Sequence, residues 1–364
     1  MLPRDPMIAT TRFLSAPQHD LSERERTILQ AVVHLYILTG TPVGSRVLSS
    51  FLARSMPLSP ATIRNTMSDL ELRGYITHPH TSAGRMPTDL GYRFYVDSLT
   101  DATTERLQAE LCTPEDAVLE LLTVPKESIV RDASRILGSL SRHLALVQIP
   151  RFREARVRTV EIVALSSERF VVIIDLDSEL VRTVSLETRS AVDHQSVLEI
   201  ARVLNEWMRN RPLQEIVSLP LDDATGMRVE PALLRLFVEQ IGNIATTPQG
   251  ATVHVSGATN LISQPEYESP ERLRSIIELI ENEDVVVHLL GSSAAGDGVT
   301  VRIGNEIPNV ELHDYSLITS TYRAGTARGT LGVIGPRRMD YGRMIGIVQL
   351  MSGVLSRTFG QSTP

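Results

Sequence analysis

Residues 59–69 place hydrogen-bonding side chains at the spacing of one helix face. Arg64 can donate two hydrogen bonds to a guanine and Asn65 can pair with an adenine, whereas serine and threonine hydroxyls can serve either base. A recognition helix that enters the major groove carries such side chains on its early turns. A solvent-exposed helix that binds nothing often has the same composition, so composition alone leaves both interpretations open. The candidate DNA-binding residues of this segment are Ser59, Thr62, Arg64, Asn65 and Ser68.

A second polar stretch begins after His78. Segments 75–78 and 85–88 have the pattern of short strands, and the stretch between them is rich in turn residues, so a β-hairpin is predicted. Polar side chains of such a hairpin could contact phosphates or the minor groove, although a hairpin without a partner would have the same pattern. His78 and His80 have no third metal ligand near them in the sequence, and no metal site is expected there. The candidate DNA-binding residues of the hairpin are His80, Thr81, Ser82 and Arg85.

Three short helices are predicted to position the first polar segment. Ser22 and Glu25 have the spacing of a capping box, and Gly40 is a typical residue at a helix end, so a helix is predicted between them. A second helix is predicted over residues 45–54, and a third begins at Ser59-Pro60. Short helices with tight connections predict a helix-turn-helix. The residues expected to face the interior are Val47, Leu48, Phe51 and Leu52 in the second helix and Ile63, Met67, Leu70 and Gly74 in the third.

The rest of the chain mixes helices with strands, which favours the α+β class. An antiparallel meander is predicted from three strands over residues 160–186, and the apolar run 285–290 is predicted to be a further strand. Residues 100–145 are predicted to be helical in two pieces that are separated by Pro125. Further helices are predicted at 196–209, 231–244, 270–280 and 340–359, and further strands at 145–149, 252–256, 299–303, 315–322 and 330–334.

Length and composition limit the class of protein. With 364 residues, 42% hydrophobic residues and one cysteine, the chain has the composition of a soluble multi-domain protein without a disulfide framework. No apolar run approaches the roughly 20 residues of a membrane helix, and the N-terminus lacks the apolar core of a signal peptide, so a cytoplasmic location is expected. The formal charge is −7, yet residues 1–99 carry ten arginines and only eight acids. The acidic surplus belongs to the later residues, so it does not exclude DNA binding by the first hundred.

The sequence offers little support for an enzyme. The glycine-containing stretches 291–298 and 325–335 have neither the lysine of a phosphate-binding loop nor a suitably placed G-x-G-x-x-G motif. There is no G-x-S-x-G motif and no His-x-x-x-His pair, and Cys112 has no sequence cue of a nucleophile. Asp175 and Asp177 suit a turn better than a catalytic pair. We therefore expect no catalysis, no cofactor and no metal.

The order and spacing of residues 59–97 are more specific than their composition. This segment has the sequence SPATIRNTMSDLELRGYITHPHTSAGRMPTDLGYRFYVD, which closely resembles the signature of the heat-inducible transcription repressor family HrcA. A second block, Gly329–Pro336 followed by Arg338–Tyr341, is similar to a family motif near the C-terminus. The resemblance brackets residues 21 to about 355 and is least distinctive near 188–266. The matching residues of the first block are Ile63-Arg64-Asn65, Met67, Leu70-Glu71, Gly74, Ile76, Pro79 through Arg85, Pro87-Thr88, Gly91-Tyr92-Arg93 and Tyr95-Val96-Asp97.

The resemblance implies a fold and a division into domains. Members of this family have an N-terminal winged helix-turn-helix, a GAF-like α+β domain and a dimerising domain that is inserted into the GAF-like fold. We assign no function to the leader that precedes them. The expected division of this chain is a flexible leader at 1–20, a winged helix-turn-helix DNA-binding domain at 21–99, a discontinuous GAF-like domain at 100–187 and 267–364, and an inserted dimerising domain at 188–266.

The resemblance also implies a function. Family members are homodimers that bind an inverted-repeat operator in double-stranded DNA upstream of chaperone operons of the GroE and DnaK type, and heat stress releases them. A GroEL-type chaperonin supports their activity. We therefore expect a cytoplasmic repressor that is associated with the nucleoid when it is bound to its operator. Because GAF-like folds often hold ligands, the alternative is a small-molecule-responsive winged-helix regulator, with polar residues of the segment 305–314 lining a pocket.

Overall fold

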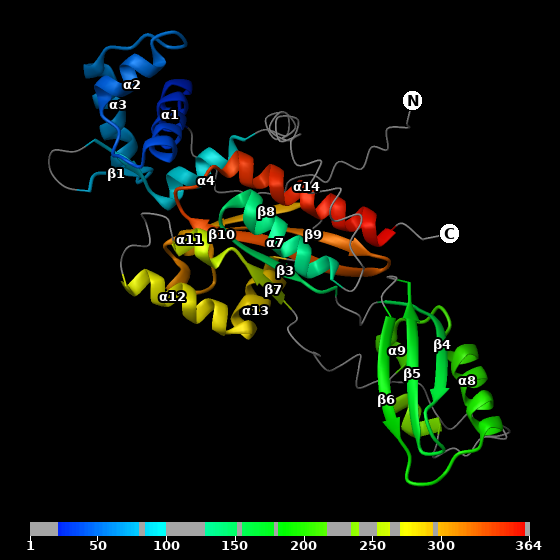
Figure 1. The fold of residues 1–364 in the computed structure, drawn as a ribbon. Coiled ribbons are helices and arrows are strands. Elements are labelled where there is room, and N and C mark those ends of the chain that lie inside the picture. The colour runs from blue at the N-terminus through cyan, green and yellow to red at the C-terminus, as the bar shows by residue number, and fades with distance from the viewer. Residues whose placement is uncertain are drawn as a thin grey trace, which may run out of the picture.

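The structure is a computed structural model in which the chain forms three units (Figure 1). A helical unit at the N-terminus adjoins a central unit built on a five-stranded sheet, and a three-stranded unit lies at the other end of that sheet. The leader expected at residues 1–20 and the helical piece expected before Pro125 lie outside the described residues. The structure describes residues 21–79, 84–99, 128–150, 155–177, 181–216, 234–239, 253–262, 270–293 and 298–360.

In its described residues, 21–79 and 84–99, the N-terminal unit has four helices and a hairpin. Its elements are α1 (Glu23–Thr39), α2 (Ser45–Leu52), α3 (Pro60–Leu72), β1 (Ile76–Thr77), β2 (Met86–Pro87) and α4 (Asp89–Asp97). The expected capping box is present, because the Ser22 hydroxyl accepts from the Glu25 amide and the Glu25 carboxylate accepts from the Ser22 amide at 2.8 Å. Gly40 ends α1 at φ 66°, in the left-handed region. The predicted order of three helices and a hairpin is confirmed.

Three positions that were expected to be interior are not. Val47 and Phe51 of α2 are 56% and 48% exposed, whereas Leu48 and Leu52 are buried. The apolar face of this eight-residue helix is wider than the surface that its neighbours cover. Gly74 lies beyond the end of α3 and has φ 80°, a left-handed conformation that glycine adopts without strain. The helical spacing therefore predicted the centre of the buried stripe and overestimated its width.

The central unit is an antiparallel sheet with helices on both faces. Its strands are β3 (Leu144–Gln148), β7 (Val253–Ser256), β8 (Val299–Ile303), β9 (Tyr315–Ala324) and β10 (Ala327–Pro336), and its helices are α7 (Ile129–Ser141), α11 (Ala258–Ile262), α12 (Pro270–Glu281), α13 (Glu283–Ser293) and α14 (Tyr341–Gly360). The strand order is β7-β3-β10-β9-β8. Side chains of β3 alternate between the faces: Ala145 and Val147 pack with α7 and α14, and Leu144 and Leu146 pack with α13.

The apolar run 285–290 is helical, so the strand predicted there is wrong. The run lies inside α13, where the Asn282 carboxamide accepts a hydrogen bond from the Val285 amide near the helix start. Val286 and Leu290 are buried at helical spacing against the sheet. A short apolar run fits a buried strand or a buried helix equally well, so its periodicity could not separate the two.

The three-stranded unit is a separate sheet with its own core. It contains β4 (Val157–Ala164), β5 (Arg169–Leu176), β6 (Val181–Glu187), α8 (His194–Met208), α9 (Leu213–Ile216) and a helical stretch at 234–239. The strands form the predicted antiparallel meander, and none of their described pairs involves the central sheet. One face packs on α8, with Phe170, Ile174 and Leu204 in the core between them.

This arrangement moves the expected domain boundaries. The boundary expected at residue 188 falls between β6 and α8, although both contribute to one core. The segment 188–266 also included β7, which pairs with β3 of the central sheet. The unit built on β4, β5 and β6 instead begins near residue 155, and β7 lies outside it. A hydrophobic pattern shows that strands exist but not which sheet they join, because strand partners are selected by tertiary contacts.

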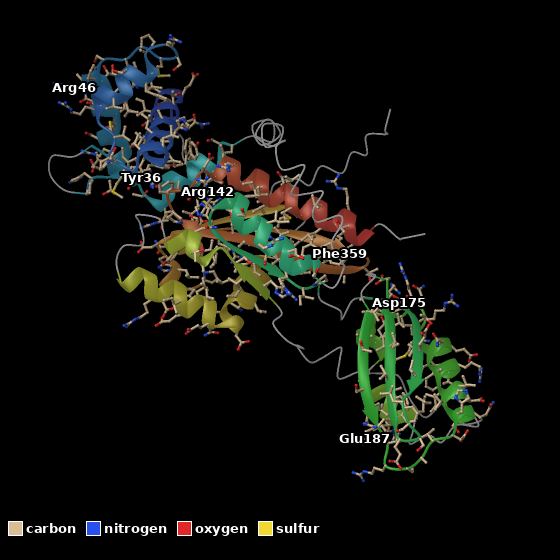
Figure 2. All side chains as sticks on the ribbon, viewed as in Figure 1. Tyr36, Arg46, Arg142, Asp175, Glu187 and Phe359 are labelled. Carbon is tan, nitrogen blue, oxygen red and sulfur yellow. The ribbon has the colours of Figure 1, made fainter. Side chains whose placement is uncertain are left out.

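The N-terminal and central units share one hydrophobic cluster, which runs from Ile28 of α1 through Val96 of α4 to Leu355 of α14. The core of the three-stranded unit contains one described residue of the central sheet, Ala327. Figure 2 shows Asp175 at the end of the three-stranded unit that is nearest the central sheet. The two outer units are therefore attached to the sheet in different ways.

Candidate nucleic-acid interface

Helix α3 is fixed by its own cap and by a buried stripe. The Ser59 hydroxyl accepts a hydrogen bond from the Thr62 amide at 3.1 Å, and Pro60 occupies the first turn. Ile63 and Leu70 are fully buried, and the stripe packs against α1 and α2. A helix that is anchored on one side in this way presents its other side in a defined orientation.

The opposite face of α3 carries the polar residues that the sequence indicated. The side chains of Arg64, Asn65 and Ser68 are exposed, and Thr62 is half-buried. The Ser68 hydroxyl donates to the Arg64 carbonyl at 3.1 Å, and the hydroxyls of Ser59 and Thr62 lie 2.9 Å apart, so these three bond within the helix. Within the described part of the chain, the Arg64 and Asn65 side chains make no hydrogen bond. Their donors and acceptors are available to a partner.

The hairpin after α3 is tied to the turn before α2. Val43 and Arg85 exchange backbone hydrogen bonds of 2.8 and 2.9 Å, while β1 and β2 pair antiparallel beside them. A Cβ atom at Gly84 would lie 2.3 Å from the Val43 carbonyl, so this close approach requires glycine. The base of the hairpin is therefore fixed relative to α2. The candidates at its tip, His80, Thr81 and Ser82, lie outside the described residues.

Arg85 is paired with a carboxylate of α3. Its Nε and Nη2 atoms both lie 2.8 Å from Oε2 of Glu71, and Nδ1 of His78 hydrogen-bonds the other oxygen of that carboxylate. Burial raises the pKa of Glu71, but the hydrogen bond with His78 and the positive charge of Arg85 outweigh it, so the net effect lowers this pKa. Glu71 thus holds the hairpin against α3, a role that no sequence pattern indicated.

A buried arginine links α4 to the central unit. The Arg93 side chain is 3% exposed and donates two hydrogen bonds to Glu306, from Nε at 2.9 Å and from Nη2 at 2.6 Å. Nη2 also donates to the Val301 carbonyl at 2.7 Å, and Nη1 donates to Asp97 at 3.1 Å. Burial lowers the pKa of Arg93, but the bonds with Glu306 outweigh this effect and raise it. No local signal pointed to this contact, because Glu306 is 213 residues away along the chain.

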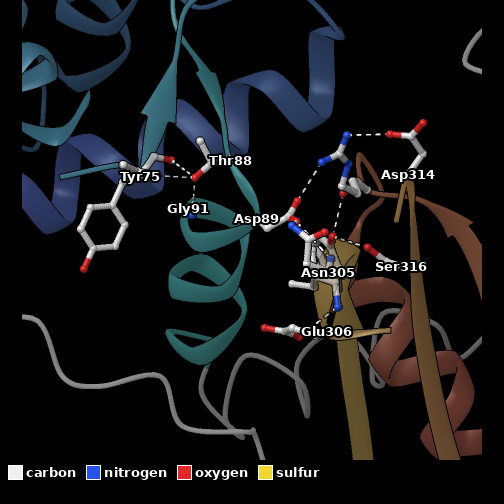
Figure 3. A network of polar contacts seen from close by, with 12 residues as sticks. Tyr75, Thr88, Asp89, Gly91, Asn305, Glu306, Asp314 and Ser316 are labelled. Carbon is white, nitrogen blue, oxygen red and sulfur yellow. Dashed lines mark hydrogen bonds and ion pairs between the residues drawn. The ribbon is translucent and has the colours of Figure 1, made fainter. Parts of the chain in front are cut away.

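A second polar contact joins the same two units (Figure 3). Asp89, at the start of α4, accepts a hydrogen bond from Nη1 of Arg337 at 2.8 Å, and Nη2 of Arg337 donates to Asp314 at 2.8 Å. The other oxygen of Asp89 accepts from the amide and the carboxamide of Asn305 at 3.2 and 3.1 Å. These four residues help to line a cleft of about 550 Å³ between the units.

Across the described ranges, no group of three or more histidine, cysteine, aspartate or glutamate side chains could hold a metal ion. No helix in the part of the chain that the structure describes has the length and apolar character needed to cross a membrane.

Similarity to known proteins identifies the family. Residues 127–345 match the family model described as HrcA protein C terminal domain. A heat-inducible transcription repressor HrcA of Chlorobium phaeobacteroides strain BS1 is 36% identical over 356 residues, covering 93% of this chain and 99% of the relative. The chain belongs to the HrcA family. HrcA repressors of Desulforamulus reducens and Geobacter sulfurreducens are 34% and 33% identical, each alignment covering 93% of this chain and 97% or 98% of the relative.

The fold also has a counterpart among solved structures. A crystal structure described as that of a hypothetical protein superposes on this HrcA-family chain with a TM-score of 0.57 and 26% sequence identity. The superposition covers 94% of this chain and 99% of the other. The likeness therefore extends over all three units.

Proposed function

We propose that this chain is a dimeric transcriptional repressor of heat-shock chaperone operons of the GroE and DnaK type, which binds an inverted-repeat operator and releases it on heat stress. In this proposal, residues 21–99 form a winged helix-turn-helix, with α2 and α3 as the helix pair and the β1–β2 hairpin as the wing. The observation that carries the proposal is the exposed polar face of α3 opposite its buried stripe. The relatives, which are named heat-inducible transcription repressors, support the same function.

Within the winged helix-turn-helix, Arg64 and Asn65 contact bases, since their exposed side chains are not used inside the described fold. Ser59, Thr62 and Ser68 assist along the same face. The wing contacts the DNA backbone or the minor groove. The side chain of Arg85 is 27% exposed beside Glu71, so it holds the wing in place and still has surface for a DNA contact. The wing residues proposed to contact DNA are His80, Thr81, Ser82 and Arg85.

The other two units are assigned to control and assembly. We propose that the central unit, at 128–150 and 253–360, is the GAF-like domain, and that residues 155–239 are the inserted dimerising domain. The face of the three-stranded sheet that points away from α8 supports the second assignment. It exposes Val163 and Val181, at 44% and 56%, as apolar surface that a second copy of the chain would cover, with Glu161 and Asp175 on the same face. The two-fold symmetry of such a dimer matches that of an inverted repeat.

Heat control in this proposal acts through a GroEL-type chaperonin in the cytoplasm. The chaperonin supports the DNA-binding form of the repressor, and the nucleoid-bound repressor loses that support when unfolded proteins occupy the chaperonin. This mechanism needs an active conformation with a small margin of stability. Chaperonin added during refolding should therefore raise the operator-binding activity in a gel-shift titration. An unchanged activity would remove the chaperonin from the mechanism.

A gel-shift titration of Arg64→Ala tests the DNA-binding assignment. The probes are the inverted repeat upstream of a chaperonin operon of the same genome and a scrambled duplex of equal length. A good base contact is worth about 1–3 kcal/mol, so operator affinity should fall about tenfold or more while binding to the scrambled duplex changes little. Arg202→Ala removes a 56% exposed arginine of α8 and is the matched control, with affinity expected to equal that of the wild type.

Two outcomes of this titration would change the assignment. An equal loss of affinity on both duplexes would make Arg64 a phosphate contact, because phosphate contacts do not depend on sequence. A wild-type protein that binds the scrambled duplex as tightly as the inverted repeat would overturn the proposed function.

A second candidate function is that of a small-molecule-responsive winged-helix regulator. The cleft of about 550 Å³ favours it, because Asn305 and Asp314 of the segment expected to line a pocket are in its wall. Thermal-shift screens with metabolites and with operator DNA separate the two candidates. A metabolite that raises the Tm and also changes operator affinity would support ligand control, whereas stabilisation by operator DNA alone would support the first candidate.

A further inference from the structure

We propose that Asp89, Arg93 and Arg337 are positioning residues that hold the N-terminal unit on the central sheet in one orientation, and that this orientation sets the operator half-site spacing. The inference rests on the proposed function, because spacing matters only to a dimer with two DNA-binding units. Such a dimer contacts half-sites about 34–36 Å apart, or a multiple of this distance, and rotation of either unit changes the separation of its recognition helices. A fixed junction accepts one spacing, whereas a hinged junction tolerates several.

The apolar part of the junction does not by itself fix an orientation. Tyr92 of α4 and Tyr341 of α14 are at most 3% exposed, and their ring centroids are 5.9 Å apart. Such contacts oppose separation of the units, but the hydrophobic effect is non-directional and resists rotation weakly. Hydrogen bonds of defined geometry add directional resistance to rotation.

Arg93 supplies that geometry from inside the junction. Its guanidinium forms two bonds with the carboxylate of Glu306 and a third with the Val301 carbonyl of β8. A bidentate arginine–carboxylate pair defines the relative orientation of both groups. Because the Arg93 side chain is 3% exposed, water cannot readily replace these bonds when α4 turns. Rotation of the N-terminal unit would break the bonds of Arg93 to Glu306 and Val301 and leave this buried charge with Asp97 of α4 as its remaining partner, which is unfavourable.

Asp89 provides a second fixed point, one turn before Arg93 on α4. Arg337 bonds one oxygen of its carboxylate, and Asn305 bonds the other. Gly304 has φ 53°, and a Cβ atom there would lie 2.2 Å from Oδ2 of Asp89, so the loop reaches Asp89 only because this residue is glycine. Two separated contacts on one rigid helix define the direction of that helix, which a single contact does not.

A contact on α1 restrains rotation about the axis of α4. Nη1 of Arg338 donates to the Ile37 carbonyl at 2.9 Å, in the last turn of α1. Two neighbouring arginines of the central unit, at 337 and 338, therefore hold two different helices of the N-terminal unit. Contacts on two helices oppose rotation about either helix axis, so the junction has the geometry of a fixed attachment.

The preference of the protein for one half-site spacing over another would not change if these residues only stabilised the fold. The probes are the native inverted repeat from upstream of a chaperonin operon and the same duplex with its spacer lengthened by about 5 bp, half a helical turn. Full-length wild-type protein should bind the lengthened duplex about 30-fold more weakly, because its two units cannot engage both half-sites. For Asp89→Ala and Arg337→Ala, the affinity for the native repeat should fall several-fold. The ratio of the affinity for the native repeat to the affinity for the lengthened duplex should fall below about fivefold.

The matched control is Asp132→Ala, which removes a carboxylate from a surface ion pair of α7, 3.6 Å from Arg135. It should keep the wild-type ratio. Thermal melting checks that each variant is folded, and Gly304→Ala replaces any variant that is not. Variants that melt close to the wild type and keep its ratio would overturn the inference and leave the proposed function intact. A wild type that does not prefer the native repeat to a scrambled duplex would overturn the proposed function instead.

Discussion

The N-terminal unit and the three-stranded unit adjoin the same central sheet through junctions of different construction. At the first junction, one hydrophobic cluster passes through both units, and the ion pair of Arg93 with Glu306 lies beside it. At the second junction, the three-stranded unit keeps its own cluster. There the Asp177 carboxylate accepts exposed hydrogen bonds from the Thr326 amide and hydroxyl at 3.2 and 2.8 Å.

This difference gives the two junctions different mechanical properties. Exposed polar contacts exchange with water at little cost, whereas buried charge-assisted bonds resist displacement. We therefore expect the N-terminal unit to move with the central sheet as one body and the three-stranded unit to reorient more easily.

The largest effect is expected when the buried ion pair is broken. Arg93→Ala leaves the carboxylate of Glu306 without its main partner, and the loss of one member of a buried pair costs about 3–5 kcal/mol. Because the Glu306 side chain is 29% exposed, we expect the free energy of unfolding to fall by the lower end of that range, about 3 kcal/mol. Urea denaturation followed by circular dichroism measures the change. A loss below about 1 kcal/mol, typical of a surface pair, would erase the distinction between the junctions.

The next largest effect is expected at the glycine beside Asp89. Gly304→Ala introduces a Cβ atom 2.2 Å from Asp89 and places alanine at φ 53°, so we expect a loss of about 1–3 kcal/mol and a lower Tm. Gly353→Ala in α14 is the matched control, since a Cβ there has no neighbour within 4 Å among the described residues. It should leave the Tm unchanged or raise it, because alanine favours a helix by about 1 kcal/mol over glycine. Similar shifts for both variants would argue against a close contact at Asp89.

A smaller effect is expected at the second junction. Asp177→Asn removes the charge from the exposed contact with Thr326, which is expected to contribute less than about 1 kcal/mol. Differential scanning calorimetry should therefore show little change in the Tm of this variant. A loss as large as that of Arg93→Ala would mean that both junctions are equally firm.

The smallest effect is a pH dependence within the N-terminal unit. Burial raises the pKa of Glu71, but His78 and Arg85 lower it by more, so its folded pKa lies below the unfolded value of about 4.3. The stability that this carboxylate contributes is present above about pH 4.3 and is lost as the pH falls through the folded pKa. In urea denaturation between about pH 5 and 3, the free energy of unfolding of Glu71→Gln should therefore fall less steeply with falling pH than that of the wild type. An identical pH dependence of the free energy of unfolding in both proteins would show that Glu71 does not hold the hairpin.

Local signals in the sequence predicted the elements of the N-terminal unit well. The capping box of Ser22 and Glu25 and the cap at Ser59-Pro60 each depend on residues three apart or fewer, and both are present. The polar face of α3 was predicted for the same reason, because it follows from helical spacing. The role proposed for that face in DNA binding remains a prediction.

Non-local contacts could not be predicted in this way. The partner of Arg93 lies 213 residues away, and no local pattern encodes such a pair. The strands over 160–186 were predicted as an antiparallel meander, but their separation from the central sheet was not predicted, because alternation does not name a strand's partner. The run 285–290 was assigned to a strand, since a short apolar segment has no periodicity that excludes a helix.

Footprinting on a chaperonin promoter of the same genome tests the central claim most directly. With the full-length protein we predict two protected stretches, related by two-fold symmetry and centred one helical turn or a multiple of it apart. With Arg64→Ala, both stretches should be lost at concentrations where the wild type protects them fully. Equal protection by wild type and variant, or protection of no inverted repeat, would contradict the claim that α3 recognises this operator.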